Sequence, residues 1–474
     1  VRNLFIIFFK RSLYRSVYNK IMNTPNWVKN SIFYHIYPLG LLGTPKINHF
    51  KEEPQEQLSR LIPWLDNALE LGATAIYIGP IFESNSHGYD TRDYFTIDRR
   101  LGTNAGMKLF CNEAHQRGLR IILDGVFNHC GRSFWAFQDI QQNGQGSSYL
   151  DWFMETNFSR KNNLGDPFTY LNWNGDDNLV KFNLSNSEIR HHLLDAIQSW
   201  MNEWQIDGLR LDAADCVRLD FWKEIRQFTS KINPDFWLMG EIVHGDYRNW
   251  IQDNMLHSVT NYECYKGLYS SFNDENLFEI AYALNRQFGE GGMYQNFWLY
   301  NFVDNHDVSR ITSELKQKQH VYPLYALLFT IPGIPSIYYG SEFGVTGKKT
   351  NWSDENLRPA LNLESIRSNP DEPDLFKLIQ KLSDLRKRIH AMAFGAYQEA
   401  FVNSKQLGFW RISDHQKVLV IINMSDQPFL LENFPVNHVC DCFDPFENIV
   451  IPLESCQQLS ILVSPTWFKI LVFE

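Results

Sequence analysis

Strand-like apolar runs alternate with amphipathic helical stretches from residue 31 to about residue 390, and this alternation most constrains the fold. The apolar runs predict eight short strands: Ile32–Tyr37, Ala75–Ile78, Leu119–Leu123, Ile206–Leu211, Trp237–Gly240, Ser258–Tyr262, Phe297–Val303 and Ser336–Tyr339. Helical periodicity fills the intervals, as in Leu58–Leu71, Met107–Gln116, Ile189–Trp204 and Leu375–Ile389. Eight strands separated by helices predict an α/β fold, a closed parallel (β/α)8 TIM barrel, with a doubly wound open sheet as the alternative.

The spacing between strand ends indicates one large insertion in this pattern. Asp212 and Glu241 lie 29 residues apart, close to one strand–helix unit of about 30 residues. Asp124 and Asp212 lie 88 residues apart, which leaves about 55 residues beyond one such unit. The excess falls in a polar, Asn- and Gly-rich, aromatic stretch. We therefore expect residues 130–180 to form an inserted lid subdomain.

The remaining domain boundaries follow from changes in the same pattern. The barrel is expected to take residues 27–129 and 181–392. Beyond that point short alternating segments, such as Leu407–Ile412, predict a small antiparallel β-sandwich over residues 393–474.

Residues 1–26 precede the pattern and are predicted to be an N-terminal extension. The apolar run Leu4–Phe9 is shorter than a signal-peptide core of about 7–15 residues or a membrane span of about 20. Globular sequence begins just after Met22. We expect Met22 to be the working start, and residues 1–21 to be either upstream translation that is not part of the native protein or a frayed extension.

Composition and cysteine usage exclude several classes of protein. The chain is 44% hydrophobic and 21% charged, close to the globular average, which excludes disorder as its main state. A net charge of −10 argues against a nucleic-acid partner, whose phosphates are bound through Lys and Arg. No apolar stretch is long enough to span a membrane, so we expect no membrane partner. The cysteines show no zinc-site spacing and predict reduced thiols in a cytoplasmic protein: Cys111, Cys130, Cys216, Cys264, Cys440, Cys442 and Cys456.

Polar side chains end four of the predicted strands. These ends are Asp124–His129, Gly208–Asp212, Gly240–Glu241 and Val303–Asp307. A single carboxylate is usually solvated or caps a helix, but four strand ends in register need another explanation, because reactive side chains of such barrels lie there. Arg210 lies two residues before Asp212, on the same face of the strand, and we expect it to keep Asp212 ionised at neutral pH.

Several carboxylates with one arginine suit glycoside hydrolysis. One carboxylate attacks the anomeric carbon while a second carboxyl protonates the leaving oxygen and later activates water. The two must lie about 5–5.5 Å apart, which adjacent barrel strands can supply. We expect Glu241 to be partly desolvated so that it can carry a proton, and Asn128 and Asp124 to be structural.

These four segments, with Gly88–Tyr94, resemble the signature regions of the alpha-amylase family of glycoside hydrolases. The resemblance implies a retaining mechanism on α-linked glucans, with Asp212 as nucleophile, Glu241 as general acid/base and Asp307 as the acid that stabilises the transition state. It also implies contacts to the sugars from Tyr89 as a stacking ring, Asp90 as a hydroxyl acceptor, and His129, Arg210, His306, Asp354 and Arg358.

The sequence departs from this family in two places. Residues 213–216 lack the Lys-His pair of many secreted amylases, so a structural calcium ion has only Asn128 to support it, and we expect no metal site and no required cofactor. Residues 241–246 are closer to the neopullulanase and cyclomaltodextrinase pattern. Those enzymes usually carry an N-terminal sandwich for which this chain has no room, which predicts a compact relative and leaves the oligomeric state open.

The predicted function is hydrolysis of α-1,4-glucosidic bonds in maltooligosaccharides and dextrins. A glucanotransferase, in which a sugar replaces water, shares the same carboxylates and remains the alternative. A non-catalytic amylase-like binding subunit is a remote alternative.

Other aromatic residues are expected to be structural. Trp135, Trp152 and Trp173 are expected to pack inside the lid rather than to stack on sugars. His35 is expected to be a hydrogen-bonded support, and His191 and His192 to be solvated.

Overall fold

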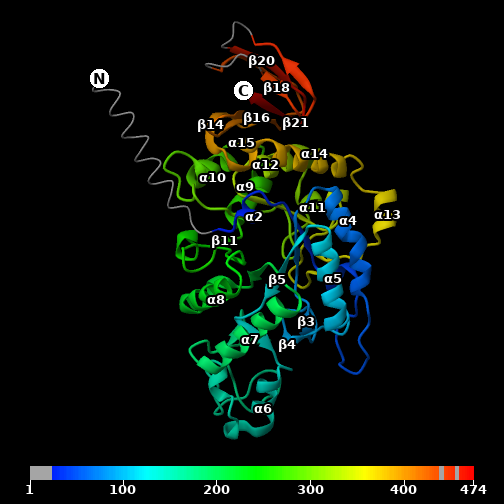
Figure 1. Cartoon of the computed structure of the whole chain (residues 1–474), viewed down its shortest axis with the longest axis vertical. Coiled ribbons are helices and arrows are strands. Elements are labelled where there is room, and N and C mark those ends of the chain that lie inside the picture. Colours follow the sequence, from blue (N-terminus) through cyan, green and yellow to red (C-terminus); the bar gives the residue numbers. More distant parts are fainter. Residues whose placement is uncertain (1–23, 437–441, 454–457, 474) are drawn as a thin grey trace, which may run out of the picture.

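The computed structural model describes residues 24–436, 442–453 and 458–473 (Figure 1). Residues 1–21 and Met22, for which we made predictions, lie outside the described residues, as do Cys440 and Cys456. In the part of the chain that is described, no helix combines the length and the apolarity that a membrane crossing needs.

Eight parallel strands form the central barrel. They are β1 (Phe33–Ile36), β2 (Ala75–Ile78), β5 (Arg120–Gly125), β9 (Gly208–Leu211), β10 (Trp237–Gly240), β11 (Ser258–Val259), β12 (Tyr300–Asn301) and β13 (Ile334–Tyr338). Each pairs with the next along the chain, β1 pairs with β13, and a bridge between Thr260 and Tyr300 joins β11 to β12. Because first and last strands are neighbours, the sheet closes on itself. The predicted barrel is confirmed and the doubly wound sheet is wrong.

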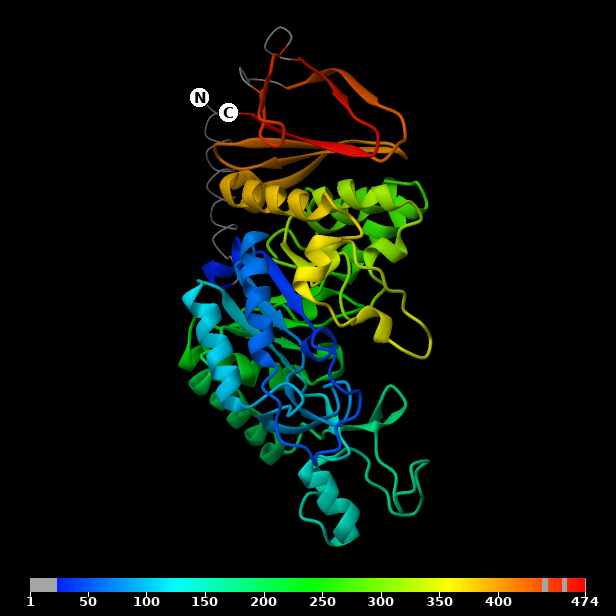
Figure 2. The same cartoon turned by 90° about the vertical axis from the view of Figure 1, so that its right-hand side faces the viewer.

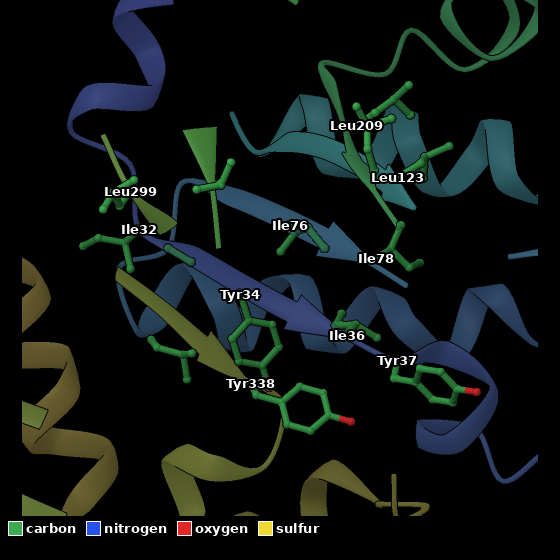
Figure 3. Packing of buried hydrophobic residues seen from close by; sticks show 14 of the residues in the cluster. Ile32, Tyr34, Ile36, Tyr37, Ile76, Ile78, Leu123, Leu209, Leu299 and Tyr338 are labelled. Atoms are coloured by element: carbon green, nitrogen blue, oxygen red, sulfur yellow. The ribbon is translucent and has the colours of Figure 1, made fainter. Parts of the chain in front are cut away.

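Successive side chains of the strands enter two separate apolar clusters, because side chains alternate between the faces of a strand. Phe33, Tyr77 and Trp237 pack with other strand residues inside the barrel. The alternate residues pack against the helices. Figure 3 shows this outer layer in Tyr34 and Ile36 of β1, Ile76 and Ile78 of β2, Leu123 of β5 and Leu209 of β9. Burial on both faces explains why the strands are continuous apolar runs.

Helices follow the strands and cover the outside of the barrel. The longer ones are α4 (Ile62–Glu70), α5 (Asn104–Gln116), α7 (Ser187–Glu203), α8 (Leu219–Ile232), α9 (Tyr262–Asn273), α10 (Phe278–Phe288), α12 (Val321–Thr330) and α14 (Leu375–Arg388). Shorter ones are α2 (Asn26–Lys29), α3 (Pro38–Leu41), α11 (Ile311–Glu314), α13 (Leu363–Ser368) and α15 (His390–Phe394). Asn186 caps α7 by accepting from the N–H groups of Glu188 and Ile189.

The excursion between β5 and β9 holds a small sheet and a helix. Strands β6 (His129–Gly131), β8 (Asp176–Lys181) and β7 (Asn172–Trp173) form the antiparallel sheet, and α6 (Trp135–Asn143) lies at the end of the molecule farthest from the C-terminus (Figure 1). His192 of α7 packs its ring against Trp135 and Trp152 of this segment. The expectation that His192 is solvated is therefore wrong, because the inserted segment covers this end of α7. A further hairpin, β3 (Phe82–Ser84) and β4 (Thr91–Ile97), follows β2.

The C-terminal strands form the predicted antiparallel sandwich. One sheet has the order β14 (Ala396–Val402), β15 (Gln406–Ile412), β16 (Lys417–Asn423), β21 (Trp467–Phe473), β18 (Cys442–Asp444) and β19 (Ile449–Ile451). The other pairs β17 (Phe429–Pro435) with β20 (Gln458–Val463). The larger sheet lies on α12, α14 and α15 (Figures 1 and 2). Arg411 fastens it there by donating to the carbonyl oxygens of Thr330 and Gly395.

Candidate active site

One buried guanidinium connects three carboxylates at the carboxyl end of the barrel. Arg210 points inward from β9 and donates to Asp124 Oδ1 at 2.7 Å and to Asp212 Oδ1 at 2.8 Å. Its other terminal nitrogen lies 2.8 Å from Glu241 Oε2. Asp124 is in register with Arg210 across β5 and β9, so the parallel pairing itself sets this contact. The two carboxyls predicted to carry the chemistry, Asp212 and Glu241, thus flank a single cation.

Ala213 connects these two carboxyls through a left-handed backbone turn, with φ at 42°. Left-handed conformations are costly for residues other than glycine and often occur at functional sites. The turn lets the Ala213 N–H donate to Glu241 Oε2 at 3.1 Å, while the Tyr262 hydroxyl reaches Glu241 Oε1 at 3.4 Å. The Glu241 side chain is 13% exposed, which agrees with the partial desolvation predicted for it.

Burial and the neighbouring Arg210 charge act on the Asp212 carboxyl in opposite directions. Burial raises the pKa of the Asp212 carboxyl well above its usual value, and the carboxylates of Glu241, Asp124 and Asp307 act in the same direction against Arg210. Arg210 lowers the pKa of Asp212 against these effects, which is the direction in which we predicted it to act.

Asp307 occupies the opposite side of the barrel mouth, in the loop after β12. Arg358 donates to its Oδ1 at 2.9 Å, and His306 Nε2 lies 3.0 Å from its Oδ2. Burial alone would raise the pKa of Asp307, but His306, Arg358 and Arg210 outweigh burial and lower it. These neighbours therefore favour the ionised form of the Asp307 carboxyl.

Tyr89 and Asp90 end up in different surroundings although they are adjacent in sequence. The Tyr89 hydroxyl donates to Asp124 Oδ2 at 3.0 Å and contacts His306 Nε2, and its ring stacks on the His306 ring. Asp90 is buried, and both its carboxylate oxygens accept from Ser86, one from the N–H and one from the hydroxyl. Asp90 does not line the cavity described next, which differs from its predicted contact with a sugar hydroxyl.

A cavity of about 950 Å³ opens over the carboxylates. Its lining includes seven predicted site residues and one lid tryptophan: Tyr89, His129, Asp212, Glu241, Asp307, Asp354, Arg358 and Trp173. Arg210 and His306 lie beneath them, buried, and act through the residues they hold. A cavity of this size with a few convergent charged groups is typical of a small-molecule site. Residues 56–369 match the sequence profile of the alpha-amylase catalytic domain.

The chain belongs to the alpha-amylase family. It is 31% identical to the cyclomaltodextrinase of Geobacillus thermopakistaniensis, over 86% of this chain and 71% of that one. It is 30% identical to the intracellular maltogenic amylase of Bacillus subtilis, over 88% of this chain and 73% of that one. A cyclic α-maltosyl-(1→6)-maltose hydrolase from Arthrobacter globiformis superposes with a TM-score of 0.80 and 26% identity, over 95% of this chain and 100% of that one. The predicted resemblance is thereby confirmed: this is a glycoside hydrolase.

The inserted segment of this alpha-amylase chain gives its three tryptophans different positions. Trp152 is buried, and Trp135 packs edge-on against it and Tyr149. Trp173 instead lines the cavity and stacks on His129, with ring centroids 5.4 Å apart. Packing was expected for all three, and Trp173 departs from it because the β7–β8 hairpin reaches over the barrel mouth.

Two histidines near the carboxylates are neutral. Burial lowers the pKa of His129 to about 3, and its Nε2 has no protein hydrogen-bond partner in the described structure although the residue lines the cavity. Burial also lowers the pKa of His35, whose ring stacks on Tyr77 at 4.1 Å. His35 Nε2 has no partner among the described residues either, so His35 supports the site by packing and not by the predicted side-chain hydrogen bond.

Sequence reasoning missed two residues of the alpha-amylase site. Tyr262 contacts Glu241 and follows β11, so its place at a predicted strand end was an available signal. Lys349 donates to the Asp307 carbonyl oxygen at 2.8 Å from an irregular loop, for which no periodic signal exists. Within the described residues, no three His, Cys, Asp or Glu side chains form a group that could hold a metal ion.

Proposed function

We propose that the protein is a retaining hydrolase that cleaves α-1,4-glucosidic bonds of maltooligosaccharides and related dextrins. The observation that carries this proposal is the Arg210 guanidinium, which holds Asp212 and Glu241 together inside a cavity whose opposite wall holds the ionised Asp307. The names of the relatives, cyclomaltodextrinase and maltogenic amylase, support α-glucans as the substrate class.

In the first step Asp212 attacks the anomeric carbon and forms a covalent glycosyl-enzyme bond, while the bond to the leaving oxygen breaks. Arg210 holds Asp212 Oδ1 and so orients the attacking carboxylate. Glu241 gives its proton to the leaving oxygen. Because Arg210 and the Ala213 N–H bond Glu241 Oε2, the proton is carried on Oε1.

In the second step the same Glu241 takes a proton from water, which attacks the anomeric carbon and releases Asp212. Two displacements at one carbon restore the α configuration. Positive charge develops on the sugar ring in both transition states, and the fixed carboxylate of Asp307 stabilises it. The Tyr89 ring supports one face of the sugar, and His129 and Asp354 are placed to bond hydroxyl groups.

These steps use only side chains of the chain itself, and we propose that no cofactor is required. Activity that survives exhaustive dialysis against a chelator, with no change in kcat, is the expected result. We further propose that the protein acts in the cytoplasm, which the name of the intracellular maltogenic amylase supports.

The deciding experiment is product analysis on starch, pullulan, cyclodextrin and maltooligosaccharides, with proton NMR of the first-formed product. We expect glucose and maltose that appear first as α-anomers. Products longer than maltotriose that dominate when maltotriose is the sole substrate would identify a glucanotransferase instead. Asp212→Asn is expected to lower kcat at least about 10⁴-fold, whereas the matched change Asp215→Asn, in the wall of the same cavity, is not.

A further inference from the structure

A second cavity adjoins the one that holds the carboxylates. It measures about 890 Å³ and shares five lining residues with the first: His87, Asp176, Lys349, Asp354 and Arg358. The two cavities therefore form one continuous cleft, and Asp354 and Arg358 mark the boundary between its inner and outer parts. None of the residues predicted from sequence lies beyond that boundary.

Trp352 lines the outer cavity and is 94% exposed, more than any other large apolar side chain in the described residues. Single exposed apolar side chains are common on protein surfaces and need no function. Trp352 differs from such cases in its position, because it lines a cavity and lies two residues before Asp354.

The backbone presents Trp352 on a fixed turn. Thr350 and Ser353 close this turn through the Thr350 hydroxyl, which donates to the Ser353 carbonyl oxygen at 2.9 Å and accepts from the Ser353 N–H at 3.0 Å. Lys349, just before the turn, is tied to the Asp307 carbonyl oxygen. At Gly347 a side chain would meet the Asn356 carbonyl oxygen at 2.0 Å, so the base of the loop is tightly packed. The backbone that carries Trp352 is thus tied to the loop that carries Asp307.

We propose that Trp352 is a stacking platform for a glucose unit of a long α-glucan chain, at the outer end of the substrate cleft. This rests on the proposed function and adds chain-length selection to it. The apolar face of a pyranose ring packs on an indole, while its hydroxyl groups remain free for polar partners. Such partners line the same cavity: the ion pair of Lys46 and Glu355 at 2.6 Å and the side chain of Asn351.

A chain must extend past Asp354 and Arg358 before it meets Trp352. Short oligosaccharides that fill only the inner cavity gain nothing from the platform, whereas longer ones gain one stacking contact. Trp352 therefore determines specificity between substrates of different length. The contact is made equally in ground state and transition state, so its loss raises KM more than it lowers kcat.

The test compares Trp352→Ala with the unmodified protein on maltotriose and maltoheptaose. We expect the ratio of kcat/KM for maltoheptaose to kcat/KM for maltotriose to fall about tenfold, mostly through KM, and Trp352→Phe to restore most of the ratio. Tyr282→Ala is the matched control, because Tyr282 is also a strongly exposed aromatic residue but lies on α10, outside both cavities.

The possible outcomes distinguish a failure of the Trp352 proposal from a failure of the proposed function. If the unmodified protein acts on no α-glucan, the proposed function fails. If it is active but Trp352→Ala leaves the ratio unchanged, the platform is refuted and the proposed function stands. A ratio that falls equally in Tyr282→Ala also refutes it. Calorimetric titration of maltoheptaose into Asp212→Asn, with and without Trp352→Ala, checks the same difference without turnover.

Discussion

Arg358 donates to Asp307 at 2.9 Å although the two residues are 51 positions apart in the chain. The same guanidinium donates to the His306 carbonyl oxygen at 2.9 Å and to Asp354 at 3.3 Å. The loop after β13 is thereby fastened to the loop after β12. The position of Asp307, the carboxylate that we propose stabilises the transition state, thus depends on a residue that does not lie at a strand end.

Removing that contact is expected to impair catalysis without unfolding the protein. A hydrogen bond to a charged group is worth about 1.5–3 kcal/mol, so Arg358→Ala should lower kcat/KM on maltooligosaccharides about 10- to 150-fold. Arg358→Lys should restore only part of the lost kcat/KM, because a single ammonium group cannot make the several hydrogen bonds of the planar guanidinium. Arg388→Ala is the control, since Arg388 pairs with Asp384 on the surface. A kcat/KM within twofold of the unmodified protein would contradict the assignment.

The barrel could be predicted because its signal is local. Each strand lies within or overlaps its predicted range, but the range Phe297–Val303 shrinks to the two residues of β12. An apolar run indicates burial, whereas a strand is defined by its pairing with a neighbouring strand. Phe302 and Val303 are buried but lie outside the two paired residues of β12, so the run is longer than the strand. The chemistry-bearing residues at the strand ends followed from the same local pattern.

The surroundings of those residues could not be predicted in the same way. Arg210 is visible beside Asp212 in sequence, but the anions that oppose it come from β5 and from the loops after β10 and β12. Asp90 bonds Ser86 because its loop folds back on itself. Lys349 and Trp352 lie on an irregular loop whose path is set by packing at Gly347. Long-range pairing and loop geometry thus account for what the sequence pattern left out.

The role of Glu241 can be separated from that of Asp212 by changing the leaving group. Glu241→Gln should lower kcat at least about 10²-fold on maltooligosaccharides, whose leaving oxygen needs a proton. The rate of the first step should fall far less for a p-nitrophenyl maltooside, because nitrophenolate leaves without being protonated. Added azide should then raise its turnover and yield a glycosyl azide of α configuration, because azide attacks the glycosyl-enzyme without a base and inverts the anomeric carbon a second time. Equal losses on both substrates would contradict this role.

Cys216 gives a chemical probe of the inner cavity. Among the cysteines that the structure describes it is exposed, whereas Cys111, Cys130, Cys264 and Cys442 are buried, and it lines the cavity beside Asp215. Burial and the Asp215 carboxylate raise the pKa of its thiol. Because the thiolate reacts, alkylation by iodoacetamide should be slow at pH 7 and accelerate as the pH rises.

Alkylation places a group in the wall of the cavity and is expected to reduce activity in parallel with its incorporation at Cys216. Saturating maltoheptaose should protect the thiol, and Cys216→Ser should keep its activity under the same treatment. Mass spectrometry of the modified peptide gives the extent of reaction. If Cys216→Ser is inactivated as fast as the unmodified protein, the inhibition arises elsewhere.

Glu342 is a buried carboxyl that the proposed mechanism does not use. Its Oε1 accepts from the Tyr34 hydroxyl at 2.6 Å and from the Asn67 amide at 2.8 Å, whereas its Oε2 has no partner among the described residues. Burial raises the pKa of Glu342 to about 7, against the opposing effect of these hydrogen bonds. The folded protein therefore binds a proton there that the unfolded chain releases at lower pH.

A carboxyl whose folded-state pKa is raised stabilises the fold fully below its unfolded pKa, and this contribution is lost as the pH rises through the folded value. Between about pH 4.5 and 7 the unmodified protein should therefore lose up to about 3 kcal/mol relative to Glu342→Gln, which stays neutral throughout. Thermal unfolding of both proteins from pH 5 to pH 8 measures this: the midpoint of Glu342→Gln should rise relative to the unmodified protein. Glu364→Gln on α13, an exposed carboxyl, should show no such trend. If the difference between the two unfolding midpoints does not change with pH, Glu342 does not titrate between pH 5 and pH 8 and the prediction is wrong.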